Sequence, residues 1–188
     1  MLITGIGGQG IQLAAQVLAR AATLEGRNVM YLGLYGGMMR GGNTDSTVVV
    51  ADGPIAAPPV VSHSWSAIAM HDEYWEPIEP KLRPGGLVLV NDATFTTEIT
   101  APVTVLRVPA TNVAADLGNP LGGSMVMLAA YAALTGIVER DALVEGMRES
   151  IPSYRTQHIE SNERALLAGW DLLPANEHPA WERSAAHA

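Results

Sequence analysis

The stretch Thr4-Gly5-Ile6-Gly7-Gly8-Gln9-Gly10-Ile11 decides the fold, because a short apolar run, Met1 to Ile3, reaches a glycine cluster and passes directly into a helical pattern. Four glycines in six positions are costly in conformational entropy, so the backbone there must bend tightly or lie against another group. The cluster also matches G-x-G-x-x-G, with which a strand-turn-helix unit binds dinucleotide phosphates. That match is weak on its own and needs support from the following strand.

The next two elements test the dinucleotide interpretation. Small apolar residues recur with helical spacing from Gln9 to Leu24, which is typical of a helix that crosses a sheet between parallel strands. Residues 28–34 then predict a buried strand. A nicotinamide-binding fold places an acidic residue at the end of this strand, to bind the ribose hydroxyls. Here the strand runs into Tyr35-Gly36, and Glu25 precedes it, so the dinucleotide interpretation loses its main support.

A second glycine-rich loop follows, with the sequence Tyr35-Gly36-Gly37-Met38-Met39-Arg40-Gly41-Gly42-Asn43-Thr44. Glycines on both sides of one guanidinium favour a recess for an anion or a partner over a flexible surface connection. Met38 and Met39 add adaptable apolar side chains of the kind often used at interfaces. A third cluster, residues 118–123, precedes the most apolar helix of the chain, which we expect to be buried around nearly its whole circumference.

Composition narrows the function classes. The net charge of the 188 residues is −8 with no basic run, which argues against nucleic-acid binding. Cysteine is absent, so the chain cannot ligate an iron–sulfur cluster through thiolates, and the five histidines lack metal-ligand spacing. Apolar residues make up 48% and charged residues 16%, which indicates that part of the surface meets another protein. We see neither a signal peptide nor a membrane span, and expect a cytoplasmic protein.

The whole pattern predicts one α/β domain with a helical C-terminal part. Residues 1–174 form this domain, and residues 175–188 form a tail that is either mobile or wraps a partner. A broken helix is expected over residues 73–82 and a turn at 84–86. The other expected strands cover residues 44–51, 67–70, 87–90 and 103–108, and the later helices cover 111–117, 124–135, 140–150 and 159–170.

No complete catalytic set is visible in the sequence. It contains no G-x-S-x-G elbow, and no Lys-Ser/Thr follows the first glycine turn as a phosphate-binding Walker motif requires. Asp72 and Glu73 are adjacent acids, but such pairs ahead of a helix are more often solvated or placed to favour the helix dipole. We therefore assign no catalytic acid, base or nucleophile.

The ordered motifs resemble the gamma subunit of 2-oxoacid:acceptor (ferredoxin) oxidoreductases. The likeness covers residues 2–170 and is carried by three strings in the same order, Ile3-Thr4-Gly5-Ile6-Gly7-Gly8-Gln9-Gly10, Tyr35-Gly36 with Arg40-Gly41-Gly42, and Met125-Val126-Met127-Leu128. The resemblance implies a Rossmann-like three-layer α/β fold with a mostly parallel sheet. It also implies an enzyme complex that oxidatively decarboxylates a 2-oxoacid to an acyl-CoA and passes electrons to ferredoxin or a similar acceptor.

The resemblance further implies where the cofactors and binding residues lie. Thiamine diphosphate, magnesium and iron–sulfur clusters are expected on partners, namely alpha and beta subunits and a ferredoxin-like subunit, while this chain covers the active-site entrance and contacts coenzyme A. The implied binding residues are Gly5, Gly7, Gly8, Gln9 and Gly10 in the first loop and Arg40, Gly41, Gly42, Asn43 and Thr44 in the facing loop. Helix-start amides and Arg40 suit an anion such as a CoA phosphate.

Several alternatives stay open. The two loops either contact coenzyme A or only dock the alpha subunit. A stand-alone NAD(P)-dependent oxidoreductase and an assembly domain without a ligand are the rival functions. The chain also departs from many relatives, which carry a pair such as Pro-Glu where it has Met38-Met39, and Asn where it has Ser124. We expect both departures in loops that face substrate or partner, so the 2-oxoacid of the better-known members is not transferred.

Overall fold

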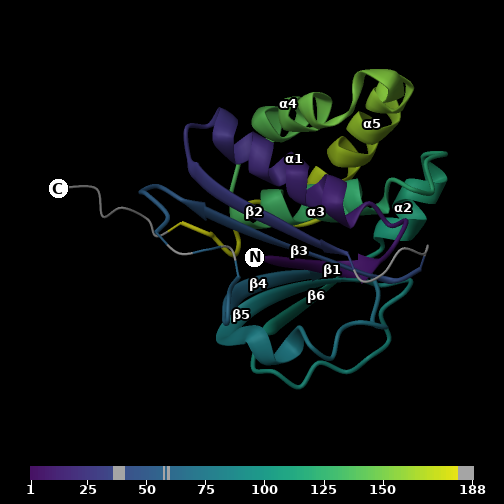
Figure 1. Ribbon diagram of the computed structural model, residues 1–188. Coiled ribbons are helices and arrows are strands. Elements are labelled where there is room, and N and C mark those ends of the chain that lie inside the picture. Colours follow the sequence, from purple (N-terminus) through teal and green to yellow (C-terminus); the bar gives the residue numbers. More distant parts are fainter. Residues whose placement is uncertain (36–40, 57, 59, 182–188) are drawn as a thin grey trace.

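The computed structural model describes residues 1–35, 41–56, 58 and 60–181, and within them a six-stranded sheet carries five α-helices on one side (Figure 1). The strands lie side by side in the order β2-β3-β1-β4-β5-β6. Their bounds are Leu2–Ile6 for β1, Asn28–Tyr35 for β2, Asn43–Ala51 for β3, Ser64–Ala69 for β4, Leu82–Asn91 for β5 and Thr104–Val108 for β6.

The strand directions confirm the predicted α/β class with a mostly parallel sheet. β1, β4, β5 and β6 pair in parallel. β3 runs antiparallel to both of its neighbours, so β2 and β3 form a hairpin that is inserted beside β1. Because β3 separates β1 from β2, the end of β2 does not lie next to the first glycine turn. This order removes the geometry with which a nicotinamide-binding fold holds the ribose.

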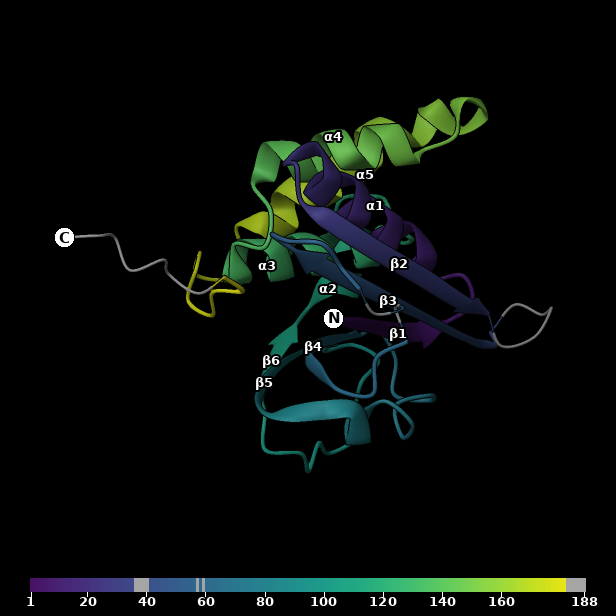
Figure 2. The ribbon, with the colours of Figure 1, turned by 60° about the vertical axis from the view of Figure 1, so that its left-hand side comes forward.

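The helices lie in two tiers over one face of the sheet (Figures 1 and 2). α1 (Ile11–Leu24) and α3 (Gly123–Thr135) form the inner tier, with α2 (Ala110–Asp116) packed against α3. α4 (Arg140–Ser150) packs on α1, and α5 (Ile159–Trp170) packs on α3. The predicted helices thus form with nearly the predicted bounds.

Irregular segments cover the opposite face and complete the predicted three layers. Trp75 and Phe95 come from two such segments and meet edge to face, with 5.3 Å between their ring centroids. Both are buried against the apolar residues that β4 and β5 present to this side. The sheet therefore has an apolar core on each face, as expected for buried parallel strands.

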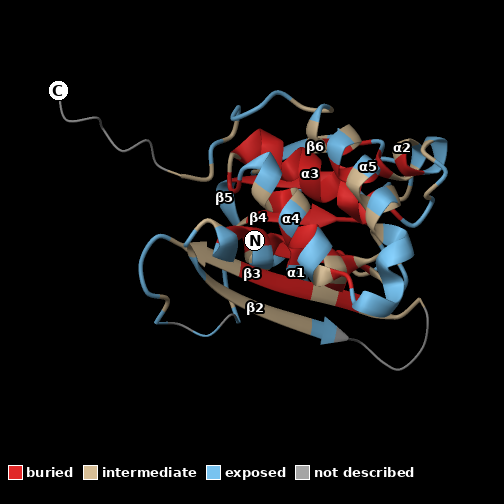
Figure 3. Ribbon diagram, turned by 90° about the horizontal axis from the view of Figure 1, so that it is seen from above, coloured by how far each residue is buried: buried red, intermediate tan, exposed pale blue. Residues whose placement is uncertain are grey.

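α3 is the centre of the larger core. All of its 13 residues are buried, and the helix forms part of the red interior in Figure 3. The prediction of an all-round buried helix is confirmed, and the cover comes from α2, α5 and the sheet of the same chain. The helix ends at Gly136, whose left-handed φ of 58° is the conformation that glycine adopts without strain.

Two local predictions are wrong. The expected turn at residues 84–86 lies inside β5, where Ser64 pairs with Leu82 but Ser66 pairs with Leu87, which marks a bulge with Gly85 at a φ of 75°. A Pro-Gly-Gly string indicates irregular backbone but does not distinguish a bulge from a strand end. Residues 73–82 form turns and a short 3₁₀ helix, η1 (Glu79–Lys81), because proline removes helical hydrogen bonds.

Glycines let the two tiers of helices approach closely. A Cβ atom at Gly146 of α4 would lie 2.8 Å from the amide nitrogen of Ala21 in α1. A Cβ at Gly169 of α5 would overlap the carbonyl oxygen of Val126 in α3. In both cases the Cβ would clash with backbone atoms, which cannot move away by a change of rotamer as a side chain can.

We predict that Gly169→Ala lowers the free energy of unfolding by about 1–3 kcal/mol through overpacking, although alanine favours a helix over glycine by about 1 kcal/mol. Urea unfolding followed by circular dichroism measures the change. Gly53→Ala is the control, because Gly53 is exposed and a Cβ there meets no atom within 4 Å. Equal stability of the Gly169→Ala variant and the wild type would contradict the prediction.

The described part of the expected tail lies on the chain's own α3 and its C-terminal end. The amides of Asn176 and Ala180 donate to the carbonyls of Ala133 and Thr135, each at 2.8 Å. The indole N–H of Trp181 donates to the carbonyl of Gly136 at 3.1 Å. Residues 175–181 therefore satisfy carbonyl groups that the end of a helix otherwise leaves without partners.

We predict that Trp181→Ala lowers the free energy of unfolding by about 1–3 kcal/mol, because it removes the indole hydrogen bond and a cation–π contact. The guanidinium of Arg27 lies 3.7 Å from the centroid of the Trp181 ring. Trp181→Phe keeps an aromatic ring but not the N–H, so its stability should lie between the other two in the same urea titration. A Phe variant as unstable as the Ala variant would show that the ring contributes nothing.

Candidate functional site

The two glycine loops of the sequence meet at the carboxyl end of β1. The amide of Gly7 donates to the carbonyl of Gly42 at 2.8 Å, and the amide of Gly41 donates to the carbonyl of Gly7 at 3.3 Å. A Cβ at Gly7 would lie 3.2 Å from the amide nitrogen of Gly41, so glycine permits this close approach. Gly8 and Gly10 have positive φ angles of 107° and 78°, which also suit glycine.

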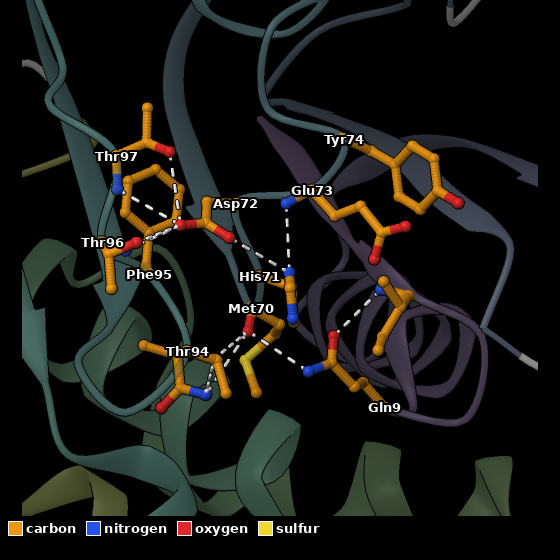
Figure 4. A network of polar contacts seen from close by, with 12 residues as sticks. Gln9, Met70, His71, Asp72, Glu73, Tyr74, Thr94, Phe95, Thr96 and Thr97 are labelled. Carbon is orange, nitrogen blue, oxygen red and sulfur yellow. Dashed lines mark hydrogen bonds and ion pairs between the residues drawn. The ribbon is translucent and has the colours of Figure 1, made fainter.

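Gly5 and Gln9 brace the first loop from below. The side-chain oxygen of Gln9 accepts a hydrogen bond from the amide of Ile6 at 3.0 Å, and its nitrogen donates to the carbonyl of Met70 at 3.3 Å (Figure 4). A Cβ at Gly5 would lie 2.6 Å from the same Gln9 oxygen. Neither residue lines the cleft described next. Gln9 holds the loop through its two hydrogen bonds, and Gly5 leaves room for the Gln9 side chain.

A cleft of about 660 Å³ opens above the joined loops. Its lining comes from four segments, residues 6–16, 42–44, 119–121 and 150–162. Of the predicted residues, Gly7, Gly8, Gly10, Gly42, Asn43 and Thr44 line it. Gly41 touches the first loop instead, and Arg40, with Met38 and Met39, lies outside the described residues.

The N-terminus of α1 opens into this cleft. Gly10 precedes the helix, no side chain caps it, and its first turn carries no acidic residue. Ile11, Gln12 and Leu13 line the cleft, and the amides of a first helical turn have no acceptor within the helix. These amides and the positive end of the helix dipole stabilise an anion.

The opposite wall was not found from the sequence. It comes from the junction of α4 and α5, which contains a second 3₁₀ helix, η2 (Ser153–His158), and brings Arg155 and His158 to the cleft. Both side chains are exposed. The sequence signal was a basic, polar segment between two helices. Only the packing of α4 on α1 and of α5 on α3 brings that segment opposite the first loop.

Asn43 presents an acceptor that the described residues leave without a partner. Its amide nitrogen donates to Asp45 at 2.9 Å, which fixes the orientation of the side chain, and Asp45 also accepts a bond of 2.7 Å from the hydroxyl of Thr4. The Oδ1 atom of Asn43 is buried and receives no hydrogen bond. Buried polar atoms are rarely left in this state. Because this atom has almost no exposed surface, a molecule in the cleft does not reach it in this structure.

The departure at position 124 is not in a loop, which corrects the sequence expectation. Ser124 lies in the first turn of α3 and is buried. A Cβ at Gly10 would lie 2.5 Å from its hydroxyl oxygen, so Ser124 packs beneath the first loop. It does not line the cleft.

Asp72 holds a neighbouring loop in place. Its Oδ2 atom accepts hydrogen bonds from the amides of Thr96 and Thr97, at 2.8 and 3.2 Å, and from both of their hydroxyls (Figure 4). The backbone hydrogen bond from Thr96 contributes most to holding the pKa of Asp72 at about 2, below its ordinary value of 3.8. The carboxylate thereby ties residues 96–97 to the end of β4, next to Gln9.

The Asp72 pKa predicts a dependence of stability on pH. The folded-state pKa lies below the unfolded value, so the contribution of Asp72 is fully present above pH 4 and is lost as the pH falls toward about 2. We predict that Asp72→Asn is less stable than the wild type at pH 6, and that the difference shrinks at pH 3. Urea midpoints at both pH values measure it, and a difference that grows in acid would contradict the assignment.

Within the described ranges, the histidines and acids form no group of three or more that could hold a metal ion. The same part of the chain contains no helix long and apolar enough to cross a bilayer. The fold and cleft therefore define a class of protein, an α/β domain in which two glycine loops meet at the end of β1 and line one side of a cleft.

Comparison with known proteins gives the family. Residues 1–172 match the model of the pyruvate ferredoxin/flavodoxin oxidoreductase family. 2-Oxoglutarate synthase subunit KorC of Methanocaldococcus jannaschii is 31% identical, over 90% of this chain and 91% of that protein. The chain belongs to this family of oxidoreductase subunits, and the resemblance seen in the glycine motifs is confirmed.

Solved structures agree in fold. The gamma subunit of a keto/oxoacid ferredoxin oxidoreductase from Geobacter sulfurreducens superposes with a TM-score of 0.76 at 27% identity, covering 90% of this chain and 94% of that one. A 2-oxoglutarate:ferredoxin oxidoreductase from Magnetococcus marinus, with 2-oxoglutarate, coenzyme A and succinyl-CoA bound, gives 0.80 at 20% identity. That match covers 95% of this chain but only 32% of the other, so the same fold also occurs within a much longer polypeptide.

Proposed function

We propose that this chain is the gamma subunit of a thiamine-diphosphate-dependent 2-oxoacid:ferredoxin oxidoreductase, in which it forms one wall of the active-site entrance and contacts coenzyme A. The family membership and the subunit names of the relatives support the gamma assignment. In this proposal thiamine diphosphate, magnesium and the iron–sulfur clusters belong to the alpha, beta and ferredoxin-like partners. The absence of cysteine from this chain is consistent with clusters held elsewhere.

The observation that carries the coenzyme A contact is the uncapped N-terminus of α1 inside the cleft. Coenzyme A carries three phosphates, and free helix-start amides stabilise phosphate groups. Arg155 stands on the opposite wall next to the hydrogen-bonding ring of His158, so a guanidinium faces the cleft in a chain whose net charge is −8. This local concentration of donors favours a phosphorylated ligand over a neutral one.

The rest of the lining suits the pantetheine arm of coenzyme A. Leu13 and Leu121 offer apolar surface in the same cleft. Coenzyme A is also bound to the Magnetococcus marinus relative, whose fold this chain shares.

A docking role without a ligand remains the alternative with a specific observation in its favour. Leu121 at the cleft and Tyr154 beside Arg155 are 75% and 72% exposed. A partner that covers the cleft would bury both. The NAD(P) alternative is disfavoured because β3 separates β1 from β2 and no acidic residue ends β2.

Changing the charge at Gln16 separates ligand binding from docking. Gln16 is exposed and lines the cleft from the second turn of α1. We predict that Gln16→Glu raises the KM for coenzyme A about 3- to 10-fold by repelling phosphate, and that Gln16→Lys lowers it, as expected for a charge within several ångströms in partly screened solvent. The assay is 2-oxoacid-dependent reduction of the acceptor by the assembled complex.

Thr23→Glu is the matched control, since it adds the same charge to an exposed position further along α1 and outside the cleft. It should leave the KM for coenzyme A unchanged. If both Gln16 variants instead weaken assembly while the residual complex keeps its KM, the docking role is correct and the coenzyme A contact is not.

A further inference from the structure

A buried glutamine joins α1 to the β2–β3 hairpin. Gln12 is 9% exposed, and its amide nitrogen donates to the carbonyl of Asp45 at 2.8 Å and to that of Leu34 at 3.4 Å. Its side-chain oxygen accepts a hydrogen bond from the hydroxyl of Tyr31. Leu34 and Asp45 stand opposite each other in the register of β2 and β3. One side chain therefore holds both strands of the hairpin close to the end from which the second glycine loop leaves.

We propose that Gln12 is a positioning residue, which sets the place of the β2–β3 hairpin end, and so of the cleft-lining residues 42–44, relative to the N-terminus of α1. A buried amide is costly unless its donors and acceptor are used. Gln12 uses both, and its three partners all belong to the hairpin. Its hydrogen bonds thus join α1 to the hairpin rather than acting within α1.

Gly33 makes room for this side chain. A Cβ atom at position 33 would overlap the side-chain oxygen of Gln12 and would lie 2.7 Å from the hydroxyl oxygen of Tyr31. Gly33 has no positive φ, so its backbone does not require glycine. Glycine inside a strand often marks a close approach of this kind. Glycine is needed at position 33 because the side-chain amide of Gln12 occupies the space that a Cβ atom would fill.

The same contacts reach the cleft. Asp45, whose carbonyl binds Gln12, holds the side chain of Asn43 with one carboxylate oxygen and accepts the hydroxyl of Thr4 with the other. Asn43 and Thr44 line the cleft, and Gln12 itself lines it. The effect of Gln12 on a ligand rests on the proposed function of the cleft, whereas its effect on the hairpin does not.

Hydrogen exchange of the full-length chain tests the positioning role without any ligand. Gln12→Leu keeps the volume but removes the hydrogen bonds, and should speed the exchange of amides in residues 33–35 and 43–46 about tenfold, with α3 and β5 unchanged. Gln16→Leu makes the same chemical change one turn along α1 and should leave the hairpin amides as they are. Unchanged hairpin exchange in Gln12→Leu, or equal acceleration throughout the sheet, would overturn the proposal.

Gly33→Ala provides an independent disturbance, because its methyl group displaces the Gln12 amide while residue 12 stays the same. It should accelerate the same amides, and the double variant Gln12→Leu/Gly33→Ala should be no faster than the more affected single variant. Fully additive effects would show that the two residues act separately and would overturn the inference.

The kinetics of the assembled complex test the link to the cleft. Gln12→Leu should raise the KM for coenzyme A several-fold and leave kcat within about twofold of the wild type. A displaced hairpin end weakens the binding of coenzyme A without changing the positions of the reacting atoms. A fall in kcat at constant KM would overturn this link. If the Gln16 charge variants leave the KM unchanged, the proposed coenzyme A contact fails, and the exchange result still decides the positioning role by itself.

Discussion

The close approach of Gly7 to Gly41 and Gly42 is the contact on which the rest of this structure depends. Two backbones exchange hydrogen bonds there with no side chain between them. The contact continues the antiparallel pairing of β1 with β3, in which Ile6 faces Asn43. It therefore fixes the inserted hairpin against β1 and leaves the start of α1 open rather than capped.

Two acidic side chains, Asp72 and Glu79, hold loops together. Asp72 binds the amides and hydroxyls of Thr96 and Thr97, and Glu79 binds those of Thr100 in the same manner. These two carboxylates attach the irregular segment after β5 to the second face of the sheet. The two carboxylates thus play the same structural part at two points of this segment.

The sequence predicts the helices and most strands because their apolar spacing is regular and their ends carry glycine or proline. It predicts the meeting of the two glycine loops through the resemblance to a known family. It misses the wall formed by Arg155 and His158, since no local pattern reports that α4 and α5 fold back over α1 and α3. The strand order is also hidden, because a hairpin inserted beside β1 has the same local pattern as strands added in order.

Likewise, the role of a side chain depends on neighbours that the sequence does not reveal. Gln9 and Gly5 belong to the motif that suggested ligand binding, yet they brace the loop from beneath. Gln12 lies just beyond the motif and attracts no notice in the sequence, although it joins three residues of the hairpin. Burial and hydrogen-bond partners separate these roles, and both are properties of the folded chain.

The origin of the cleft in four distant segments has a consequence for how the protein is made. Residues 6–16 are synthesised first, but the wall they face is completed only by residues 150–162. Contacts between segments that are far apart in the sequence slow folding. The long chain between them must lose conformational entropy before the contact can form. On the ribosome the sheet and α1 emerge well before the last two helices, so the cleft comes into existence only when nearly the whole chain has been released. A chain that ends before residue 150 therefore lacks the wall that residues 150–162 form.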